Sequence, residues 1–291
     1  MSHYVVTGGA GFIGSAIVRR LLREGARKVV VIDNLLTGHE ENLDEVRSSV
    51  DFQRADVRNY EEIAPIVRGA AVVFHEAALP SVPRSIDDPV PSHECNIDGT
   101  FNVLRAAKEG QAGRVVYAAS SSAYGDTEVL PKVESMTPRP KSPYALQKLV
   151  GEYYAGVFSS CYGLETVALR YFNVYGPRQA LSNPYTGVCA IFSGRLLNDE
   201  SPMIFEDGEQ TRDFVHVSDI VQANMLALET DKADYEAVNI GTGSPISVSD
   251  ISLMLAQGLH KDIKPQITGK YREGDIRHCV ADISRARKLL G

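Results

Sequence analysis

The sequence predicts an α/β protein with a Rossmann-type, doubly wound parallel sheet and a smaller C-terminal α/β lobe. Two features lead to this. Short apolar runs alternate with longer amphipathic stretches over the first half, and a glycine-rich turn follows the first apolar run. Strand–helix alternation implies parallel strands joined by right-handed crossovers, and strands buried on both faces read as continuous apolar runs. The 291 residues, 44% of them hydrophobic, suffice for such a domain and a lobe.

The elements of the first half follow in chain order. Strands are expected at Tyr4–Thr7, Val29–Asp33, Ala71–His75 and Arg114–Ala118. Helices are expected between them at Ile13–Glu24, Glu61–Arg68 and Asn96–Lys108. A longer helix is expected from Pro143 to about Cys161, followed by a strand at Glu165–Arg170.

Beyond Gly176 the pattern loosens, so we expect a first domain over residues 1–176 and a lobe over 177–291 that partly interleaves with it. Loops are expected at Pro177–Gly187 and Asp207–Arg212. The remaining expected elements are helices at Val217–Leu228 and Val248–Leu255, and a strand at Ala237–Ile240.

Composition excludes several classes of protein. A net charge of -7 argues against nucleic-acid binding. The four cysteines are scattered without a C-x-x-C pair, so we expect neither a metal site nor a disulfide framework. No apolar run approaches the roughly 18 residues of a membrane span, and no signal peptide is evident. We therefore expect a cytoplasmic protein that binds neither membrane nor nucleic acid.

The glycine-rich turn predicts a dinucleotide site. In T-G-G-A-G-F-I-G-S the glycines are Gly8, Gly11 and Gly14, a G-x-x-G-x-x-G spacing between a strand and a helix. Glycine permits a tight turn and lets a pyrophosphate approach the backbone, and the following helix points its first amides at the phosphates. Asp33, 19 residues after Gly14, could accept hydrogen bonds from the adenosine ribose. Asp33 would also repel a 2′-phosphate, which favours NAD over NADP; the alternative is that it merely ends a strand.

Three residues form a candidate reactive group. Tyr144 and Lys148 share one helix face at i and i+4, and Ser120 follows the strand Arg114–Ala118. A free phenol has a pKa of about 10, and lowering it to about 7 requires roughly 4 kcal/mol of stabilisation of the phenolate. The lysine ammonium and a positive nicotinamide could supply this, with Ser120 relaying the proton. Y-x-x-x-K alone carries little weight; its conjunction with the glycine turn carries the interpretation.

These features resemble the extended short-chain dehydrogenase/reductase superfamily. The segments H-E-A-A, A-A-S-S-S-A-Y-G-D, S-P-Y-A-L-Q-K, L-R-Y-F-N-V-Y-G-P-R-Q and Y-R-E-G-D-I-R-H-C-V-A-D are similar to UDP-hexose 4-epimerases over essentially the whole chain. The resemblance implies Tyr144 as base, Lys148 as the residue that tunes it and Ser120 as proton relay. The implied NAD contacts, besides the three glycines, Asp33, Tyr144 and Lys148, are Phe12, Ile13, Asn34, Asp56, Val57, Ala77, Ala78, Asn96 and Phe172.

The resemblance also implies a uridine diphosphate site and a sugar site. Asn173, Arg212, Arg272 and Asp275 fall at the diphosphate and uridine positions, and Ser81, Ser121, Ser122 and Cys279 at the sugar positions. The implied reaction oxidises C4, lets the 4-keto sugar turn over and returns the hydride to the opposite face.

Several alternatives stay open. Related dehydratases place an Asp-Glu pair after the relay residue, where this chain has Ser121 and Ser122, which favours epimerisation. UDP-glucuronate 4-epimerases share most of the motifs, and a non-catalytic NAD-binding scaffold would have the same fold. Cys279 is small where plain-hexose enzymes carry a tyrosine, so we expect UDP-GlcNAc and UDP-GalNAc to be accepted; otherwise it is a small buried hydrophobe. The family also implies a homodimer through helices Asn96–Lys108 and Tyr144–Cys161.

Overall fold

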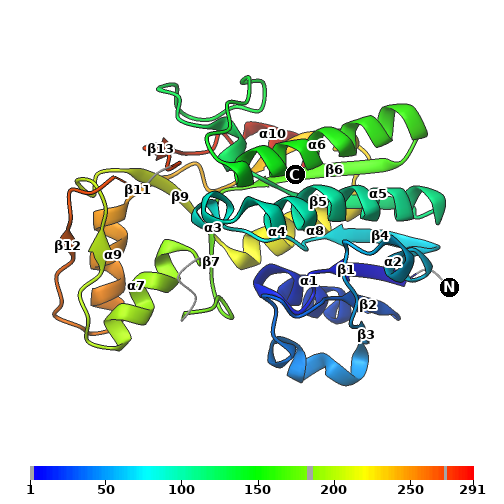
Figure 1. Cartoon of the computed structure of the whole chain (residues 1–291), viewed down its shortest axis with the longest axis horizontal. Coiled ribbons are helices and arrows are strands. Elements are labelled where there is room, and N and C mark those ends of the chain that lie inside the picture. The colour runs from blue at the N-terminus through cyan, green and yellow to red at the C-terminus, as the bar shows by residue number, and fades with distance from the viewer. Residues whose placement is uncertain (1–2, 182–185, 272–273) are drawn as a thin grey trace.

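The computed structural model describes residues 3–181, 186–271 and 274–291. Its main feature is a seven-stranded sheet, parallel throughout, in the order β10-β6-β5-β4-β1-β2-β3 (Figure 1). The strands are β1 (His3–Thr7), β2 (Val29–Ile32), β3 (Asp51–Gln53), β4 (Ala70–His75), β5 (Arg114–Ser120), β6 (Glu165–Tyr171) and β10 (Ala237–Ile240). The order reverses beside β1, which opens a crevice at the carboxyl ends of β1 and β4. The predicted Rossmann-type fold is confirmed.

Helices cover both faces of this sheet (Figure 1). One layer contains α1 (Phe12–Arg23), α8 (Val217–Glu229) and α10 (Ser284–Leu290), and the other α2 (Tyr60–Val67), α5 (Gly99–Glu109) and α6 (Pro143–Tyr162). Successive strand residues serve opposite layers, because Cβ atoms alternate across a strand. Val6 packs in the core cluster with Ile17 and Ile220, whereas its neighbour Val5 packs with Ile63 and Val103. This two-sided burial explains why the strands read as apolar runs.

Short irregular helices lie in the connections between these elements. They are η1 (Glu40–Ser49), α3 (Val82–Asp87), α4 (Pro89–His93), η2 (Glu94–Asp98) and η3 (Ser121–Tyr124). The helix expected from Asn96 is divided, because η2 is a π-helical turn and regular α-helix begins at Gly99. Such π turns often occur at functional sites.

Among the described residues, the lobe beyond β6 contains two small sheets and two helices, which Figure 1 shows beside the carboxyl end of the main sheet. Its elements are β7 (Asn173–Tyr175), α7 (Val188–Leu197), β8 (Met203–Ile204), β9 (Thr211–His216), β11 (Pro245–Ser247), α9 (Val248–Gly258), β12 (Gln266–Ile267) and β13 (His278–Cys279). Helix α7 was not predicted. Strand β10 lies between these elements in sequence but pairs with β6 in the main sheet.

We expected a loop over Asp207–Arg212, and its predicted C-terminal boundary is wrong. Thr211 and Arg212 already belong to β9. The strand begins T-R-D, three polar residues that hide it in the sequence. Asp213 is completely buried there and accepts hydrogen bonds from the backbone N–H groups of Thr242, Gly243 and Ala281. These partners are distant in sequence. The hydrogen bonds that allow the polar side chain of Asp213 to be buried therefore form only in the tertiary structure.

Across the residues described, we find no helix whose length and apolar character would let it cross a bilayer.

Candidate active site

The glycine-rich turn is shaped for close backbone approach. Gly8 has φ +67°, and a Cβ there would lie 2.7 Å from the backbone nitrogen of Ala77. A Cβ on Gly14 would lie 2.2 Å from the Gly8 carbonyl oxygen. Helix α1 starts at Phe12 with no side-chain cap from Gly11, so its first amides keep their hydrogen-bonding capacity for a ligand. The turn therefore fits a dinucleotide pyrophosphate, which takes its hydrogen bonds from such amides.

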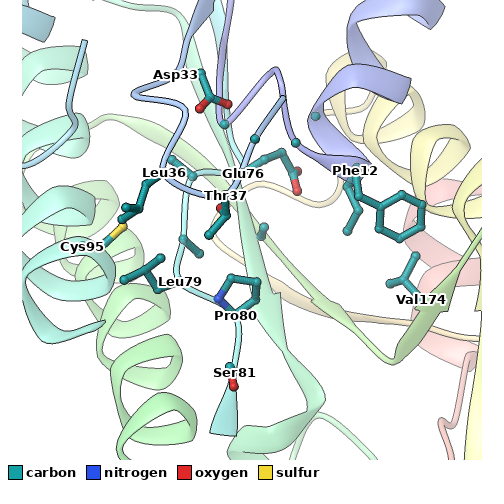
Figure 2. Close-up of a pocket in the computed structure, with 18 of the residues that line it drawn as sticks. Phe12, Asp33, Leu36, Thr37, Glu76, Leu79, Pro80, Ser81, Cys95 and Val174 are labelled. Carbon is teal, nitrogen blue, oxygen red and sulfur yellow. The ribbon is translucent and has the colours of Figure 1, made fainter. Parts of the chain in front are cut away.

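A cavity of about 420 Å³ extends from this turn along the carboxyl edge of the sheet. Figure 2 shows Asp33 at one end and Ser81 at the other, with Thr37 and Glu76 between them. The cavity brings together most of the residues predicted for the cofactor and the reaction. They are Gly8, Gly11, Phe12, Ile13, Gly14, Asp33, Asn34, Val57, Ala77, Ala78, Ser81, Ser120, Tyr144, Lys148, Phe172 and Asn173.

Asp33 is the first residue after β2 and is held by the backbone around it. Its carboxylate accepts hydrogen bonds from the N–H groups of Ala10 at 2.9 Å and Leu35 at 2.8 Å. Burial raises the pKa of Asp33, while these two amides act in the opposite direction. The carboxylate is thus fixed at the end of the cavity, where a ribose hydroxyl could donate to it.

Two residues predicted at the cofactor do not line this cavity. Asp56 accepts a hydrogen bond from Asn34 Nδ2 at 2.9 Å, and its hydrogen bonds with Arg58 lower its pKa to about 2. Asn96 is buried behind the wall, where its Oδ1 accepts from the N–H of Leu79 at 2.8 Å. Asn96 thus supports the lining residue Leu79 from behind, whereas the part-exposed Asp56 is bonded to the lining residue Asn34.

Tyr144 and Lys148 enter the cavity from the first turns of α6. Ser142 caps this helix, accepting from the N–H of Ala145 at 3.2 Å, and Pro143 occupies the first helical position. Lys148 Nζ donates to the carbonyl oxygen of Ala118, two residues before the end of β5, at 2.8 Å. The helix cap and this bond fix the positions of the two side chains relative to the sheet.

The electrostatics of the pair are set by burial. Burial raises the pKa of Tyr144 to about 12, against which the hydrogen bond with Ser120 acts. Burial also lowers the pKa of Lys148 to about 8. Ser120 Oγ lies 2.9 Å from Ser122 Oγ. A neutral phenol is therefore favoured in this structure, and a base at Tyr144 requires added positive charge nearby.

A second cavity of about 210 Å³ adjoins the first, with which it shares Ser120, Tyr171, Phe172 and Asn173. Among the residues predicted for the substrate it is lined by Ser121, Ser122, Asn173, Arg212, Asp275 and Cys279. Arg212 Nη2 donates to Asp275 Oδ1 at 2.7 Å, so these two predicted substrate residues hold each other. Ser81 lines only the first cavity, where it caps α3. Arg272 lies outside the described residues.

Sequence reasoning missed many cavity residues, and four with titratable side chains illustrate why. Glu76 and Arg178 line the first cavity, Lys141 the second, and Tyr171 both. Glu76 and Tyr171 follow or end a strand, a signal that was available because ligands bind at carboxyl ends of parallel strands. Arg178 and Lys141 lie in loops, and no local sequence pattern indicates which cavity a loop side chain will reach. No group of three or more His, Cys, Asp or Glu side chains suited to a metal ion occurs in the described ranges.

Comparison with known proteins agrees with this geometry. Residues 4–241 match the model of the NAD dependent epimerase/dehydratase family. A UDP-glucose 4-epimerase from Mycolicibacterium smegmatis is 37% identical over 293 residues, which cover 99% of this chain and 92% of that protein.

Two solved structures are similar over the same length. The UDP-N-acetylglucosamine 4-epimerase of Methanobrevibacter ruminantium, in complex with UDP-N-acetylmuramic acid, has a TM-score of 0.93 and 39% identity, covering 99% of this chain and 91% of that one. The UDP-glucose 4-epimerase of Thermotoga maritima, with UDP-glucose, has a TM-score of 0.93 and 37% identity, covering 99% and 92%. The predicted resemblance is confirmed: this chain belongs to the NAD dependent epimerase/dehydratase family and is an epimerase whose cofactor is NAD.

Proposed function

We propose that this protein interconverts the C4 epimers of a UDP-hexose through a 4-keto intermediate. The observation that carries the proposal is the position of Ser120, which lines both cavities beside Tyr144. A sugar in the smaller cavity would meet the reactive group where the cofactor cavity begins. NAD, when bound, supplies the hydride acceptor and returns the hydride.

The chain's own residues would handle the proton and the orientation. Tyr144 would accept the C4 hydroxyl proton, and Ser120, which hydrogen-bonds to Tyr144, would pass it on. Lys148 would stabilise the phenolate by its ammonium charge. Because burial raises the pKa of Tyr144 to about 12, the base would form only when both Lys148 and the cofactor contribute positive charge.

The diphosphate would bind at the arginine end of the smaller cavity. Arg212 is held by Asp275 and by the carbonyl oxygen of Arg277, at 2.7 and 2.9 Å, so its guanidinium is already oriented. A guanidinium suits a diphosphate because it offers several donors in one plane. We assign Arg272 to the same role on the resemblance alone.

Epimerisation is favoured over dehydration by the residues after Ser120. Ser121 and Ser122 open the helix η3, and both line the smaller cavity. The residues that line this cavity include one carboxylate, Asp275, and it is paired with Arg212. Elimination of the C6 oxygen needs an acid and a base beside the sugar, and this wall offers hydroxyl groups instead.

We further propose that N-acetylhexosamines are among the substrates. Cys279 is 4% exposed and lines the smaller cavity, and its thiol hydrogen-bonds to Ser121. A cysteine leaves room beside C2 that a tyrosine would fill. The similar enzyme from Methanobrevibacter ruminantium is a UDP-N-acetylglucosamine 4-epimerase, which supports this assignment.

The decisive experiment is a panel assay. The purified protein is incubated with UDP-glucose, UDP-galactose, UDP-GlcNAc, UDP-GalNAc and UDP-glucuronate, and the C4 epimers are separated chromatographically. We expect conversion of the hexosamine pair, and a Tyr144→Phe variant slower by about 10²–10⁴-fold, as expected for loss of an acid–base group. Conversion of the uronate alone would replace the proposed substrate, and no conversion of any sugar would refute the proposed reaction.

We also propose a homodimer through α5 and α6. The outer face of these helices exposes large apolar side chains, of which Leu146 is 50%, Tyr153 56% and Val157 48% exposed. Their spacing of seven and four residues puts them on one stripe of α6. Light scattering should show a dimer for the wild type and a monomer for Tyr153→Asp, whereas Leu253→Asp on α9, at a residue 51% exposed, should stay dimeric.

A further inference from the structure

Glu76 is a carboxyl group in the wall of the cofactor cavity that the proposed reaction does not use. It is the first residue after β4, and its backbone N–H donates to the carbonyl oxygen of Thr7 at 3.2 Å. Figure 2 shows its side chain among the residues that line the cavity. Placing a carboxyl group there is costly, because partial burial removes water from the anion.

A chain of hydrogen bonds fixes this carboxyl group. Tyr171 OH donates to Glu76 Oε1 at 2.8 Å, and Asn224 Nδ2 donates to Tyr171 OH at 2.7 Å. Asn224 is fully buried and is anchored on the carbonyl oxygen of Ile220, in its own helix, at 2.9 Å. Each donor points toward Glu76, so the chain favours the ionised carboxylate.

The sheet places Glu76 beside the contact that holds Lys148. Strands β4 and β5 pair with His75 opposite Tyr117, so the next residues along, Glu76 and Ala118, are neighbours at the carboxyl edge. Lys148 Nζ donates to the carbonyl oxygen of Ala118 at 2.8 Å. No carboxylate within the described ranges forms an ion pair with Lys148 at 4.0 Å or less, and Glu76 is the carboxylate whose charge raises the pKa of Lys148.

The other titratable groups around the pair stay neutral near pH 7. They come from η2, β4, β5, β6 and α6 itself. Burial raises the pKa of Cys95 to about 11 and that of Tyr144 to about 12, and it lowers the pKa of His75 to about 3. Burial also raises the pKa values of Tyr117 and Tyr171 well above their ordinary range. Glu76, with its pKa raised by burial to about 7, and Lys148, at about 8, are thus the two that can be charged together.

We propose that Glu76 is a positioning residue of the reaction: its carboxylate, held by Tyr171, keeps Lys148 in the ammonium form in a site that would otherwise discharge it. The proposal deepens the proposed function, because Lys148 must be positive to stabilise the phenolate of Tyr144. Glu76 itself need not touch the substrate. Its effect reaches the reacting atoms through the charge of Lys148.

The direct test follows the titration of Lys148 by NMR of protein labelled with ¹³C at the lysine Cε. The resonance is assigned by its loss in Lys148→Met. In Glu76→Gln, which keeps an acceptor for Tyr171 but removes the charge, the titration midpoint should fall by about one pH unit or more, the range of a close opposite charge. An unchanged midpoint would overturn the proposal.

Two further variants guard the result. Glu24→Gln removes a surface carboxylate that pairs with Arg20, and the Lys148 midpoint should not move. Tyr171→Phe keeps the Glu76 carboxyl group but removes the hydrogen bond that stabilises its ionised form. The Lys148 titration midpoint should therefore fall by less than in Glu76→Gln. If Glu76→Gln does not fold, Tyr171→Phe decides the matter, because an unchanged midpoint there would then overturn the proposal.

Turnover gives a second, separable result. With the UDP-sugar that the panel identifies, the alkaline limb of kcat against pH should move to lower pH in Glu76→Gln by the shift seen in the NMR titration. The NMR experiment needs no substrate, so it stands if the proposed reaction fails. An active wild type whose Glu76→Gln variant keeps the same alkaline limb would overturn the positioning role alone.

Discussion

Arg170 and Glu152 form a buried two-pronged ion pair that ties β6 to α6, the helix that carries Tyr144. Arg170 Nε and Nη2 donate to the two carboxylate oxygens at 2.8 and 2.6 Å, and the side chains are 4% and 8% exposed. Arg170 Nη1 also donates to Tyr124 OH at 2.7 Å. This network lies under the helix on the sheet side and fixes where the reactive residues sit.

Breaking this pair should strongly destabilise the protein. Glu152→Ala leaves the Arg170 guanidinium buried without its counter-ion, which typically costs about 3–5 kcal/mol of unfolding free energy. Urea denaturation measures the loss. Combining Glu152→Leu with Arg170→Met should recover most of it, because no charge then remains buried. The exposed pair Arg20–Glu24 is the control, and Glu24→Ala should cost less than about 1 kcal/mol. A cost for Glu152→Ala as small as this would show that the buried pair does not stabilise the fold.

Asp33 should control both affinity for NAD and the choice against NADP. Asp33→Asn removes the charge that would accept from the ribose hydroxyls, and one charged hydrogen bond is worth about 1.5–3 kcal/mol, or roughly 10–100-fold in NAD affinity. Calorimetry with NAD and with NADP measures both affinities. The disadvantage of NADP should shrink because the repelling carboxylate is gone. Asp51→Asn, at an exposed residue of β3, should leave both affinities unchanged. An equal loss of affinity for NAD and NADP would mean that Asp33 only holds the glycine-rich turn in place and does not contact the ribose.

Cys279→Tyr should narrow the range of substrates. The larger ring would fill the space beside C2, so turnover of UDP-GalNAc should fall at least tenfold relative to UDP-glucose, since steric selectivity of this kind is worth about 1–3 kcal/mol. Rates are measured for both sugars on the same preparation, with UDP-glucose as the internal control. Equal ratios in the wild type and the variant would show that Cys279 is only a small buried side chain.

His75 should make stability depend on pH below neutrality. Its ring nitrogens lie 2.8 Å from Thr7 Oγ1 and 3.0 Å from Thr100 Oγ1, and burial lowers its pKa to about 3. In the unfolded chain His75 has an ordinary pKa of about 6.5, so between pH 6.5 and 3 it binds a proton that it does not bind in the folded protein. The unfolding free energy should therefore fall as the pH falls from about 6.5 toward 3, and by about 2 kcal/mol at pH 5.

The measurement compares urea midpoints at pH 7.5 and 5.0 for the wild type and His75→Gln. The variant should lose about 2 kcal/mol less than the wild type over this interval, because its amide does not titrate. His93→Gln, at an exposed residue, should behave like the wild type. Identical losses in all three proteins would show that His75 binds a proton as readily in the folded protein as in the unfolded chain.

The sequence by itself determined the sheet, the glycine turn and the placement of Tyr144, Lys148 and Ser120, because these depend on local order: apolar runs, glycines in a tight turn and an i, i+4 spacing. It did not determine β9, whose polar residues are satisfied by partners from Thr242 onward. Nor did it show that Asn96 is buried behind Leu79, or that Glu76 follows β4 beside Ala118, whose carbonyl oxygen accepts from Lys148. Contacts between segments far apart in the chain decide which side chains share a cavity and how burial shifts their pKa values. Only the tertiary structure sets these contacts.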